Sequence, residues 1–367
     1  MITFKEQKFC LVTVPIDKRG AVPLSRLLNI LKDISTEICL VSGYCGYHMF
    51  LKSKNVDSYE VKTMSHFAIL NAIFIQIQIS YYLIKLRKNF TSIIFFFGGE
   101  SLILPLIISK FLRKESIVIL TGNPTMGLDD SILIKIRNFI QRLVFKITDK
   151  IFVYSKSVIL ERNLKKFRKK VHIVNHHFIN LEKFKINTPF NEREKIIGYV
   201  GELRELKGVM NILKAMPEML KKEKELKFFI IGEGILEAEI QDFIIQNNLS
   251  ENVKLLGWVE NEELPHYLNK LKLLILASGT EGLPGVLIEG MACGTPVLIT
   301  KVGAVPDVVN NEVNSFLLQK NSPQCISESV IKIFRNENLE IISNNAFYHV
   351  RNYFSYDYVL NLWRKNL

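Results

Sequence analysis

The chain of 367 residues contains two successive series of short apolar runs, each followed by small or polar residues and then by a helix-like pattern. The first series comprises KFCLVTV, EICLVSG, SIIFFFGG, SIVILTG and KIFVYSK. From Lys195 the pattern begins again with KIIGYVG, KFFIIGEG, NVKLLGWV and KLLILAS. Apolar strands that alternate with helices form parallel sheets covered by helices on both faces. The sequence therefore predicts an α/β protein with two doubly wound, Rossmann-like domains.

The polar segment NTPFNERE separates the two series and contains a proline. Such a composition is typical of a linker between domains. We therefore expect an N-terminal domain at residues 1–186, a linker at 187–194 and a C-terminal domain at 195–350. The remaining residues, 351–367, are expected to form a helix that packs back on the N-terminal domain.

Basic residues are concentrated in the first half of the chain. Residues 1–185 contain 29 basic and 13 acidic residues, which gives a net charge of +16. The remaining residues contain 19 basic and 23 acidic residues, which gives a net charge of −4. A basic surface can meet nucleic acid, an anionic membrane or a phosphorylated substrate. No RRM, KH, helix-turn-helix or zinc-finger pattern is present, so nucleic acid is not an expected partner. An anionic membrane surface is the expected one.

The stretch from Phe67 to Ile84 has no charged residue over 18 positions. It contains Asn71, Gln76 and Gln78, whose polar side chains are costly in hydrocarbon, so a buried or membrane-surface helix is favoured over a membrane span. The five cysteines form no CxxC pair, and the N-terminal residues lack the pattern of a secretory signal. These features predict a cytoplasmic protein that associates peripherally with the inner face of the cell membrane.

A loop rich in glycine and proline precedes a helix-like segment within TEGLPGVLIEGMACGTPVLITKVGAVPDVV, residues 280–309. Pro284 suits the first turn of a helix and Gly294 suits its C-terminal cap. The unpaired amides and the positive end of the dipole at such a helix start form an anion site that suits a diphosphate. No D-x-D motif is present, and the adjacent Asp129 and Asp130 resemble helix-start residues. We therefore expect no bound metal.

Two glutamates flank the start of this helix. Glu281 lies just before it, and Glu289 lies about two turns into it. Carboxylates at this spacing accept hydrogen bonds from sugar hydroxyls, but the spacing alone is more often that of an ordinary solvated helix. The surrounding sequence is more specific, because EGLPGVLIEGMACGTPVLITKVGAVPDVV resembles the signature of glycosyltransferase family 4, with its E-x7-E pair, its MACGxPV turn and its later GxxPDVV.

The resemblance implies the GT-B fold, in which two Rossmann-like domains face a cleft and the second domain binds most of the donor. It implies that Glu289 holds the donor ribose and that Glu281 contacts the transferred sugar. Backbone amides of the intervening loop and helix start would surround the diphosphate and the sugar. These residues are Gly282, Leu283, Pro284, Gly285, Val286 and Leu287.

A second match to the family lies in GYVGELRELKG, which resembles the family's G-R-L-x-x-x-K-G. The family's lysine, which neutralises the departing diphosphate, corresponds to Lys207, and Gly201 and Gly208 match its glycines. Glu202 occupies the position of the family's arginine. Arg204 stands two residues further on and would replace that charge if the loop geometry differs.

A third match, VKLLGWVENEELPHYL, resembles the loop that receives the nucleotide base in the family. Gly257 and Trp258 are therefore expected to lie beside the base. A core position is the alternative for Trp258.

The first domain departs further from the family pattern. Where the family often has a histidine near the reacting centre, this chain has VILTGNPT. His176 and His177 are expected to be packing or hinge residues and not ligands. Four residues are expected on the acceptor side from their places after predicted strands: Gly20, Glu100, Thr121 and Gly122.

The expected function is a retaining, metal-independent hexosyltransferase that moves a sugar from a nucleotide-diphosphate donor. The donor is a substrate, and no separate cofactor is expected. The acceptor would be a glycan or a polyprenyl-diphosphate-linked glycan in cell-surface polysaccharide biosynthesis. A nucleotide-sugar epimerase of the same architecture and a catalytically degenerate glycan-binding subunit are the alternatives.

Overall fold

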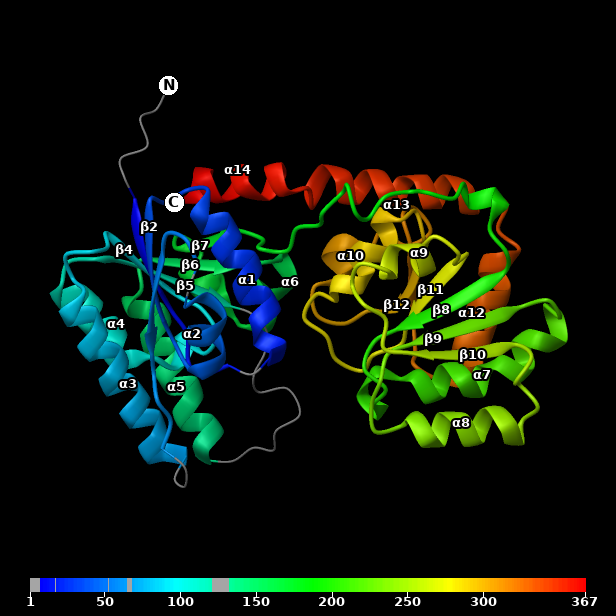
Figure 1. Ribbon diagram of the computed structural model, residues 1–367, viewed down its shortest axis with the longest axis horizontal. Helices are drawn as coiled ribbons and strands as arrows, with labels where there is room; N and C mark the ends of the chain where they lie inside the picture. The colour runs from blue at the N-terminus through cyan, green and yellow to red at the C-terminus, as the bar shows by residue number, and fades with distance from the viewer. Residues whose placement is uncertain (1–6, 17, 52, 65–67, 121–131) are drawn as a thin grey trace. The chain divides into compact units, whose positions relative to one another are not determined.

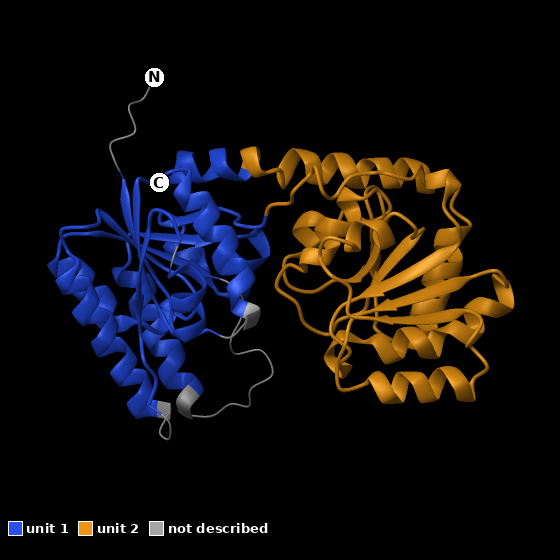
Figure 2. Ribbon diagram, in the orientation of Figure 1, with its two compact units in different colours: residues 1–177, 359–367 blue, residues 178–358 orange. Residues whose placement is uncertain are grey.

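The computed structural model describes residues 7–16, 18–51, 53–64, 68–120 and 132–367 (Figure 1). The chain divides into two compact units (Figure 2): unit 1 contains residues 1–177 and 359–367, and unit 2 contains residues 178–358. Each unit contains one sheet, in which the strand pairs are parallel. The α/β class and the two parallel sheets predicted from the sequence are confirmed.

The sheet of unit 1 has the order β3-β2-β1-β4-β5-β6-β7 within the described residues. The chain winds from β1 to one side and from β4 to the other, so the strand order reverses between these two strands. Ligands of doubly wound sheets bind at the carboxyl ends of the strands beside such a reversal. The strands are β1 (Lys8–Val12), β2 (Glu37–Ser42), β3 (Val56–Glu60), β4 (Ser92–Phe95), β5 (Glu115–Leu120), β6 (Lys150–Val153) and β7 (Val171–Ile173).

Helices connect these strands because right-handed crossovers carry the chain back over the sheet. In Figure 1, α3, α4 and α5 follow one another along the sheet, and α4 packs against both of its neighbours. The helices are α1 (Lys18–Lys32), α2 (Tyr44–Phe50), α3 (Ala68–Lys85), η1 (Gly99–Ser101), α4 (Ile103–Phe111), α5 (Ile132–Ile147), α6 (Lys156–Glu161) and η2 (Leu164–Phe167).

Helix α3 covers nearly all of the uncharged stretch noted in the sequence. Among the residues that the structure describes, no helix combines the length and the apolar composition needed to cross a membrane. The prediction of a helix that does not span the bilayer agrees with this finding.

The sheet of unit 2 has the order β10-β9-β8-β11-β12-β13, and its strand order reverses between β8 and β11. Its strands are continuous apolar runs, such as LLIL in β11 and VLIT in β12, and these are buried throughout. The strands are β8 (Ile196–Val200), β9 (Lys227–Ile231), β10 (Val253–Gly257), β11 (Leu273–Leu276), β12 (Val297–Thr300) and β13 (Phe316–Leu318).

The helices of unit 2 bury a large apolar core against this sheet. Leu213, Met216 and Val330 belong to that core and are fully buried. The helices are η3 (Phe190–Glu192), η4 (Glu205–Lys207), α7 (Val209–Lys222), α8 (Glu237–Gln246), α9 (Leu264–Leu268), α10 (Gly285–Ala292), α11 (Val305–Val308), α12 (Pro323–Phe334) and α13 (Leu339–Tyr353).

The segment 187–194, predicted as a linker, packs within unit 2, and the division between the units falls at residue 177. The backbone amides of Asn187 and Thr188 donate to Asn269 Oδ1 at 2.7 and 3.2 Å. The guanidinium of Arg193 donates to the carbonyl oxygens of Leu271 and other residues of unit 2. Two backbone amides and the Arg193 side chain of this segment are thus paired with groups of unit 2.

The C-terminal helix α14 (Tyr356–Asn366) is anchored in unit 1 from Val359 onward. The Trp363 ring is fully buried, and its Nε1 donates to the carbonyl oxygen of Asn175 at 2.9 Å. The ring also lies edge-on to Phe152. The residues around 351, expected to begin this helix, belong to α13 instead.

Candidate functional site

The candidate site lies where the strand order of the second sheet reverses. The loop after β8 carries Lys207, and the loop after β11 carries Glu281. These strands are neighbours in the sheet. Loops that follow adjacent parallel strands meet at the same edge, so the topology alone brings these two side chains together.

The Lys207 Nζ lies 2.5 Å from the Glu281 Oε1, and the two side chains form an ion pair. The lysine side chain is 32% exposed and the glutamate 15%. An ion pair this accessible contributes little to stability. An anionic ligand can therefore compete for the ammonium group without a large cost to the fold.

Glycines allow the loop of Lys207 to lie directly against the loop after β11. Gly208 has a φ of +73°, and a Cβ there would lie 2.2 Å from the carbonyl oxygen of Ala277. The amide of Gly279 donates to the carbonyl oxygen of Leu206 at 2.9 Å. A side chain at Gly208 would push the two loops apart and displace the neighbouring Lys207.

A third loop supports the backbone of Glu281. Gly303 follows β12 with a φ of +53°, and a Cβ there would lie 2.1 Å from the carbonyl oxygen of Glu281. The amide of Ala304 donates to the carbonyl oxygen of Gly282 at 2.8 Å. Our sequence prediction assigned no role to Gly303, although the GAVPDVV motif that contains it was a signal for one.

The helix α10 begins just after this loop, with Pro284 as its N-cap residue and no side-chain cap. The first amides of a helix have no partner inside the helix, and together with the dipole they attract anions. The amides predicted to surround a diphosphate, from Gly282 to Leu287, thus belong to this loop and to the first turn. Glu289 lies on the same helix and is 8% exposed.

Arg204 does not join the Lys207–Glu281 pair in this structure. Its Nη1 lies 3.5 Å from the Oε2 of Glu202, and both side chains are more than 40% exposed. The Tyr199 hydroxyl donates to the carbonyl oxygen of Glu202 at 2.8 Å, which fixes the backbone at that position. Arg204 is the N-cap residue of η4, the turn that carries Lys207.

Gly257 and Trp258 form an open end of β10. Gly257 has a φ of +66°, and a Cβ there would meet nothing within 4 Å. Trp258 is 65% exposed, and its Nε1 donates to Glu260 Oε1 at 3.0 Å. Of the two interpretations of Trp258, a core position is excluded. At the neighbouring strand ends, Gly232 fits tightly against the carbonyl oxygen of Gly201.

The residues expected on the acceptor side have different environments. Glu100 is buried after β4, and its Oε1 accepts a hydrogen bond from Arg162 Nη2 at 3.0 Å, with both side chains 6% exposed. Gly20, expected on the acceptor side after the first strand, lies in the first turns of α1. Thr121 and Gly122 lie outside the described residues.

His176 and His177 are packed in the interior of unit 1, at its boundary. Their rings lie 4.4 Å apart, and His176 also meets Phe96 edge-on. Burial lowers the pKa of His176 to about 4, with the positive charge of Arg26 adding to the effect. Both histidines are therefore neutral packing residues at physiological pH. Within the described residues, no group of three histidine, cysteine or acidic side chains could hold a metal.

Comparison with known protein families gives a match in the second half of the chain. Residues 180–347 match the family model described as "Glycosyl transferases group 1". The "Uncharacterized glycosyltransferase MJ1178" of Methanocaldococcus jannaschii is 34% identical over 151 residues, 41% of each chain. The "Capsular polysaccharide biosynthesis glycosyltransferase CapM" of Staphylococcus aureus is 31% identical over 166 residues, 44% of this chain and 42% of that protein. The chain thus aligns with less than half the length of these relatives.

Solved structures match over nearly the whole chain. The structure of Anabaena Alr3699/HepE in complex with UDP has a TM-score of 0.76 at 14% identity and covers 98% of both chains. The lipopolysaccharide outer core galactosyltransferase WaaB has a TM-score of 0.73 at 16% identity and covers 98% of this chain and 99% of that one. At such low identity the likeness shows the fold, which is GT-B.

Proposed function

We propose, from the match of residues 180–347 to the family model of glycosyl transferases group 1, that the chain transfers a sugar from a nucleotide-diphosphate sugar to a glycan or lipid-linked glycan. The transfer proceeds with retention at the anomeric carbon and without a catalytic metal. The observation that carries the proposal is the Lys207–Glu281 pair beside the uncapped start of α10. A partly exposed cation, a carboxylate and several helix-start amides lie at the same edge of the sheet.

The diphosphate of the donor binds at the start of α10 in this proposal. Amides of the first turn donate to its oxygens, and Lys207 leaves Glu281 to pair with the phosphate charge. These groups stabilise the negative charge that grows on the leaving phosphate, so they act more strongly in the transition state than in the ground state. A divalent metal is then not needed for this purpose.

In this proposal Glu281 and Glu289 bind different sugars of the donor. Once Lys207 has moved to the phosphate, Glu281 is available to accept hydrogen bonds from hydroxyls of the transferred sugar. Glu289, which lies one turn into α10, accepts hydrogen bonds from the ribose hydroxyls. The exposed Trp258 and the open Gly257 leave room for the nucleotide base. Related structures are described as complexes with UDP and UDP-glucose, so UDP-sugars are the first donors to test.

In this proposal the acceptor hydroxyl reacts on the face of the sugar from which the phosphate leaves, so the configuration is retained without a protein nucleophile. The bond between the anomeric carbon and the phosphate oxygen breaks, and the acceptor hydroxyl forms its new bond on the same face. The proton of that hydroxyl passes to the leaving phosphate oxygen. The protein supplies position and charge stabilisation.

The acceptor is proposed to be attached to a membrane, on which unit 1 docks. Apolar side chains are exposed along the consecutive helices α3, α4 and α5, and unit 1 carries most of the basic residues (Figure 1). Basic side chains near an anionic leaflet contribute roughly 1 kcal/mol each, and apolar insertion adds to this. We define the apolar face by these residues: Ile69, Leu70, Ile73, Ile77, Tyr81, Ile84, Leu104, Ile107, Phe111, Ile136 and Phe139.

Donor turnover tests the proposal. The purified chain is incubated with a panel of UDP- and GDP-sugars, and free nucleotide is quantified by mass spectrometry. Slow release without acceptor, accelerated by a membrane extract that supplies one, is expected for a transferase. One observation favours a second candidate: Glu202 occupies the family's arginine position and pairs with Arg204. A non-catalytic subunit would bind a sugar nucleotide without releasing free nucleotide.

A further inference from the structure

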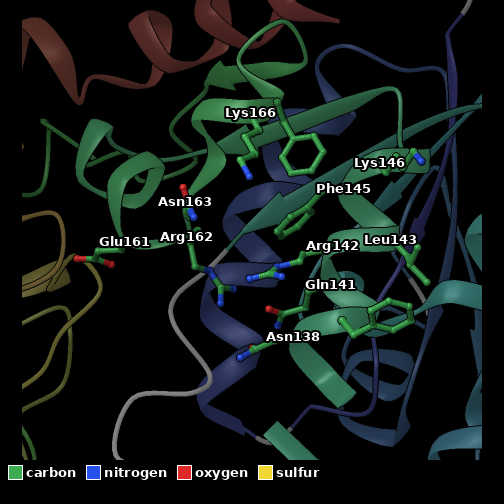
Figure 3. Close-up of a pocket in the computed structure, with 12 residues that line it drawn as sticks. Asn138, Gln141, Arg142, Leu143, Phe145, Lys146, Glu161, Arg162, Asn163 and Lys166 are labelled. Carbon is green, nitrogen blue, oxygen red and sulfur yellow. The ribbon is translucent and has the colours of Figure 1, made fainter. Parts of the chain in front are cut away.

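Unit 1 contains a pocket of about 570 Å³ that the proposed donor chemistry does not use (Figure 3). Its walls come from the second half of α5 and from the segment where α6 ends and η2 begins. Four of its lining side chains are cationic: Arg142, Lys146, Arg162 and Lys166. Only Glu161 among the lining residues is acidic. The pocket is therefore suited to an anion.

A buried amide at this pocket has no hydrogen-bond partner among the residues that the structure describes. Gln141 lines the pocket and is 6% exposed, and its Nε2 makes no hydrogen bond. Buried donors of this kind are rare because water and protein acceptors normally satisfy them. In Figure 3 the side-chain ends of Gln141, Arg142 and Arg162 are gathered in the same part of the pocket. A ligand oxygen placed there would pair the amide.

The cations differ in how firmly they are held. Arg162 is fixed by its buried ion pair with Glu100 at 3.0 Å. Arg142, Lys146 and Lys166 are exposed and form no salt bridge with any part of the described chain. One guanidinium is thus pre-positioned, while the other three charges are available to a ligand. Guanidinium groups suit phosphate because their planar forks donate two hydrogen bonds to adjacent oxygens.

We propose that this pocket binds a phosphate group, carried either by a lipid headgroup or by a soluble phosphorylated molecule. Arg142, Arg162 and the Gln141 amide donate to the phosphate oxygens, and Lys146 and Lys166 balance the charge. Phe139 belongs both to the pocket wall and to the apolar face, so a headgroup phosphate is within reach of a docked unit 1. The proposal goes beyond donor turnover and does not depend on it.

The test compares two double variants that remove the same charge. Arg142→Gln with Lys166→Gln removes two pocket cations, whereas Lys165→Gln with Lys169→Gln removes two exposed lysines that do not line the pocket. Calorimetry measures binding of sn-glycerol 3-phosphate, and flotation measures binding to vesicles of phosphatidylglycerol. A third variant, Gln141→Leu, removes the amide without changing the charge. Circular dichroism verifies that each variant is folded.

We expect the pocket variant to bind glycerol 3-phosphate at least about tenfold more weakly, because two charge-assisted contacts are lost. Gln141→Leu should weaken binding by a smaller factor, and the control variant by less than about twofold. A parallel loss with vesicles identifies the lipid headgroup as a source, and an unchanged vesicle affinity identifies a soluble one. Equal losses in the pocket and control variants, or no phosphate binding by the wild type in either assay, would overturn the proposal.

Discussion

The two units present their functional surfaces in different ways. In unit 2, three loops at the strand edge are held against one another by Gly208 and Gly303, whose positions leave no room for a Cβ. In unit 1, the notable features are an exposed apolar face and a cationic pocket on helices. In unit 2 the site is defined by the backbone of closely packed loops, whereas in unit 1 the surface is defined by the types of its side chains. A site of the unit 2 kind suits a donor that many enzymes share, and a surface of the unit 1 kind suits a variable acceptor or a membrane.

The largest effect is expected from removing the side chains of the unit 2 site. Lys207→Ala and Glu289→Ala should each reduce transfer by about 10²–10³-fold, because preorganised charge and donor contacts are lost. Initial rates with the preferred donor measure this. Lys214→Ala, a lysine on the exposed side of α7, is the matched control. Wild-type rates in the two folded site variants would show that the donor binds elsewhere.

A glycine pair tests whether close loop contact specifies the site. Gly303→Ala should destabilise the chain by more than about 2 kcal/mol and lower its rate, because strained φ and a clash with Glu281 act together. Gly257→Ala has a similar φ of +66° but meets nothing within 4 Å, so it should cost only about 1 kcal/mol. Urea unfolding measures both. Equal costs would mean that backbone strain alone, and not loop contact, fixes the site.

The apolar face of unit 1 is tested by flotation with vesicles. Ile73→Asn with Ile77→Asn should weaken binding to anionic vesicles by about tenfold, because two exposed side chains lose their transfer to the headgroup boundary. Val313→Asn, an exposed apolar residue of unit 2, should have no effect. High salt should weaken wild-type binding. No binding of the wild type to anionic vesicles at low salt would leave a soluble acceptor as the better interpretation.

The interior of unit 1 should make stability depend on pH. His176 has a pKa lowered by burial to about 4, whereas the unfolded chain protonates it near its ordinary value. The folded state therefore keeps its full stability above the pKa that His176 has in the unfolded chain. Its free energy of unfolding falls as the pH drops toward 4, because the unfolded chain then binds a proton that the folded His176 does not. Between pH 7 and pH 5 this histidine should account for about 2 kcal/mol of lost stability. His176→Phe should reduce the slope of urea stability against pH, and an unchanged slope would contradict the assignment.

The loop geometry of unit 2 is more visible in the sequence than the surface of unit 1, for physical reasons. Loop geometry in unit 2 requires glycine at Gly208 and Gly303, and these are visible in the sequence within RELKG and GAVPDVV. The salt bridge between Glu100 and Arg162 joins residues far apart in the chain, so no local sequence pattern predicts it. Gly20 lies inside α1 because this helix begins before Pro23 and continues through it, which a proline in the sequence does not suggest. The segment 187–194 was predicted to be a linker from its polar composition. The sequence does not reveal that its polar groups have buried partners in unit 2.

The central claim is that unit 2 cleaves the donor without a metal and that the sugar keeps its anomeric configuration. The most direct measurement is a transfer reaction in excess EDTA, with the anomeric configuration of the product read by nuclear magnetic resonance. We predict an undiminished rate and a product with the configuration of the donor, because Lys207 and the amides of α10 carry the charge that a metal would otherwise balance. A rate abolished by EDTA and restored by magnesium or manganese, or an inverted product, would contradict the account.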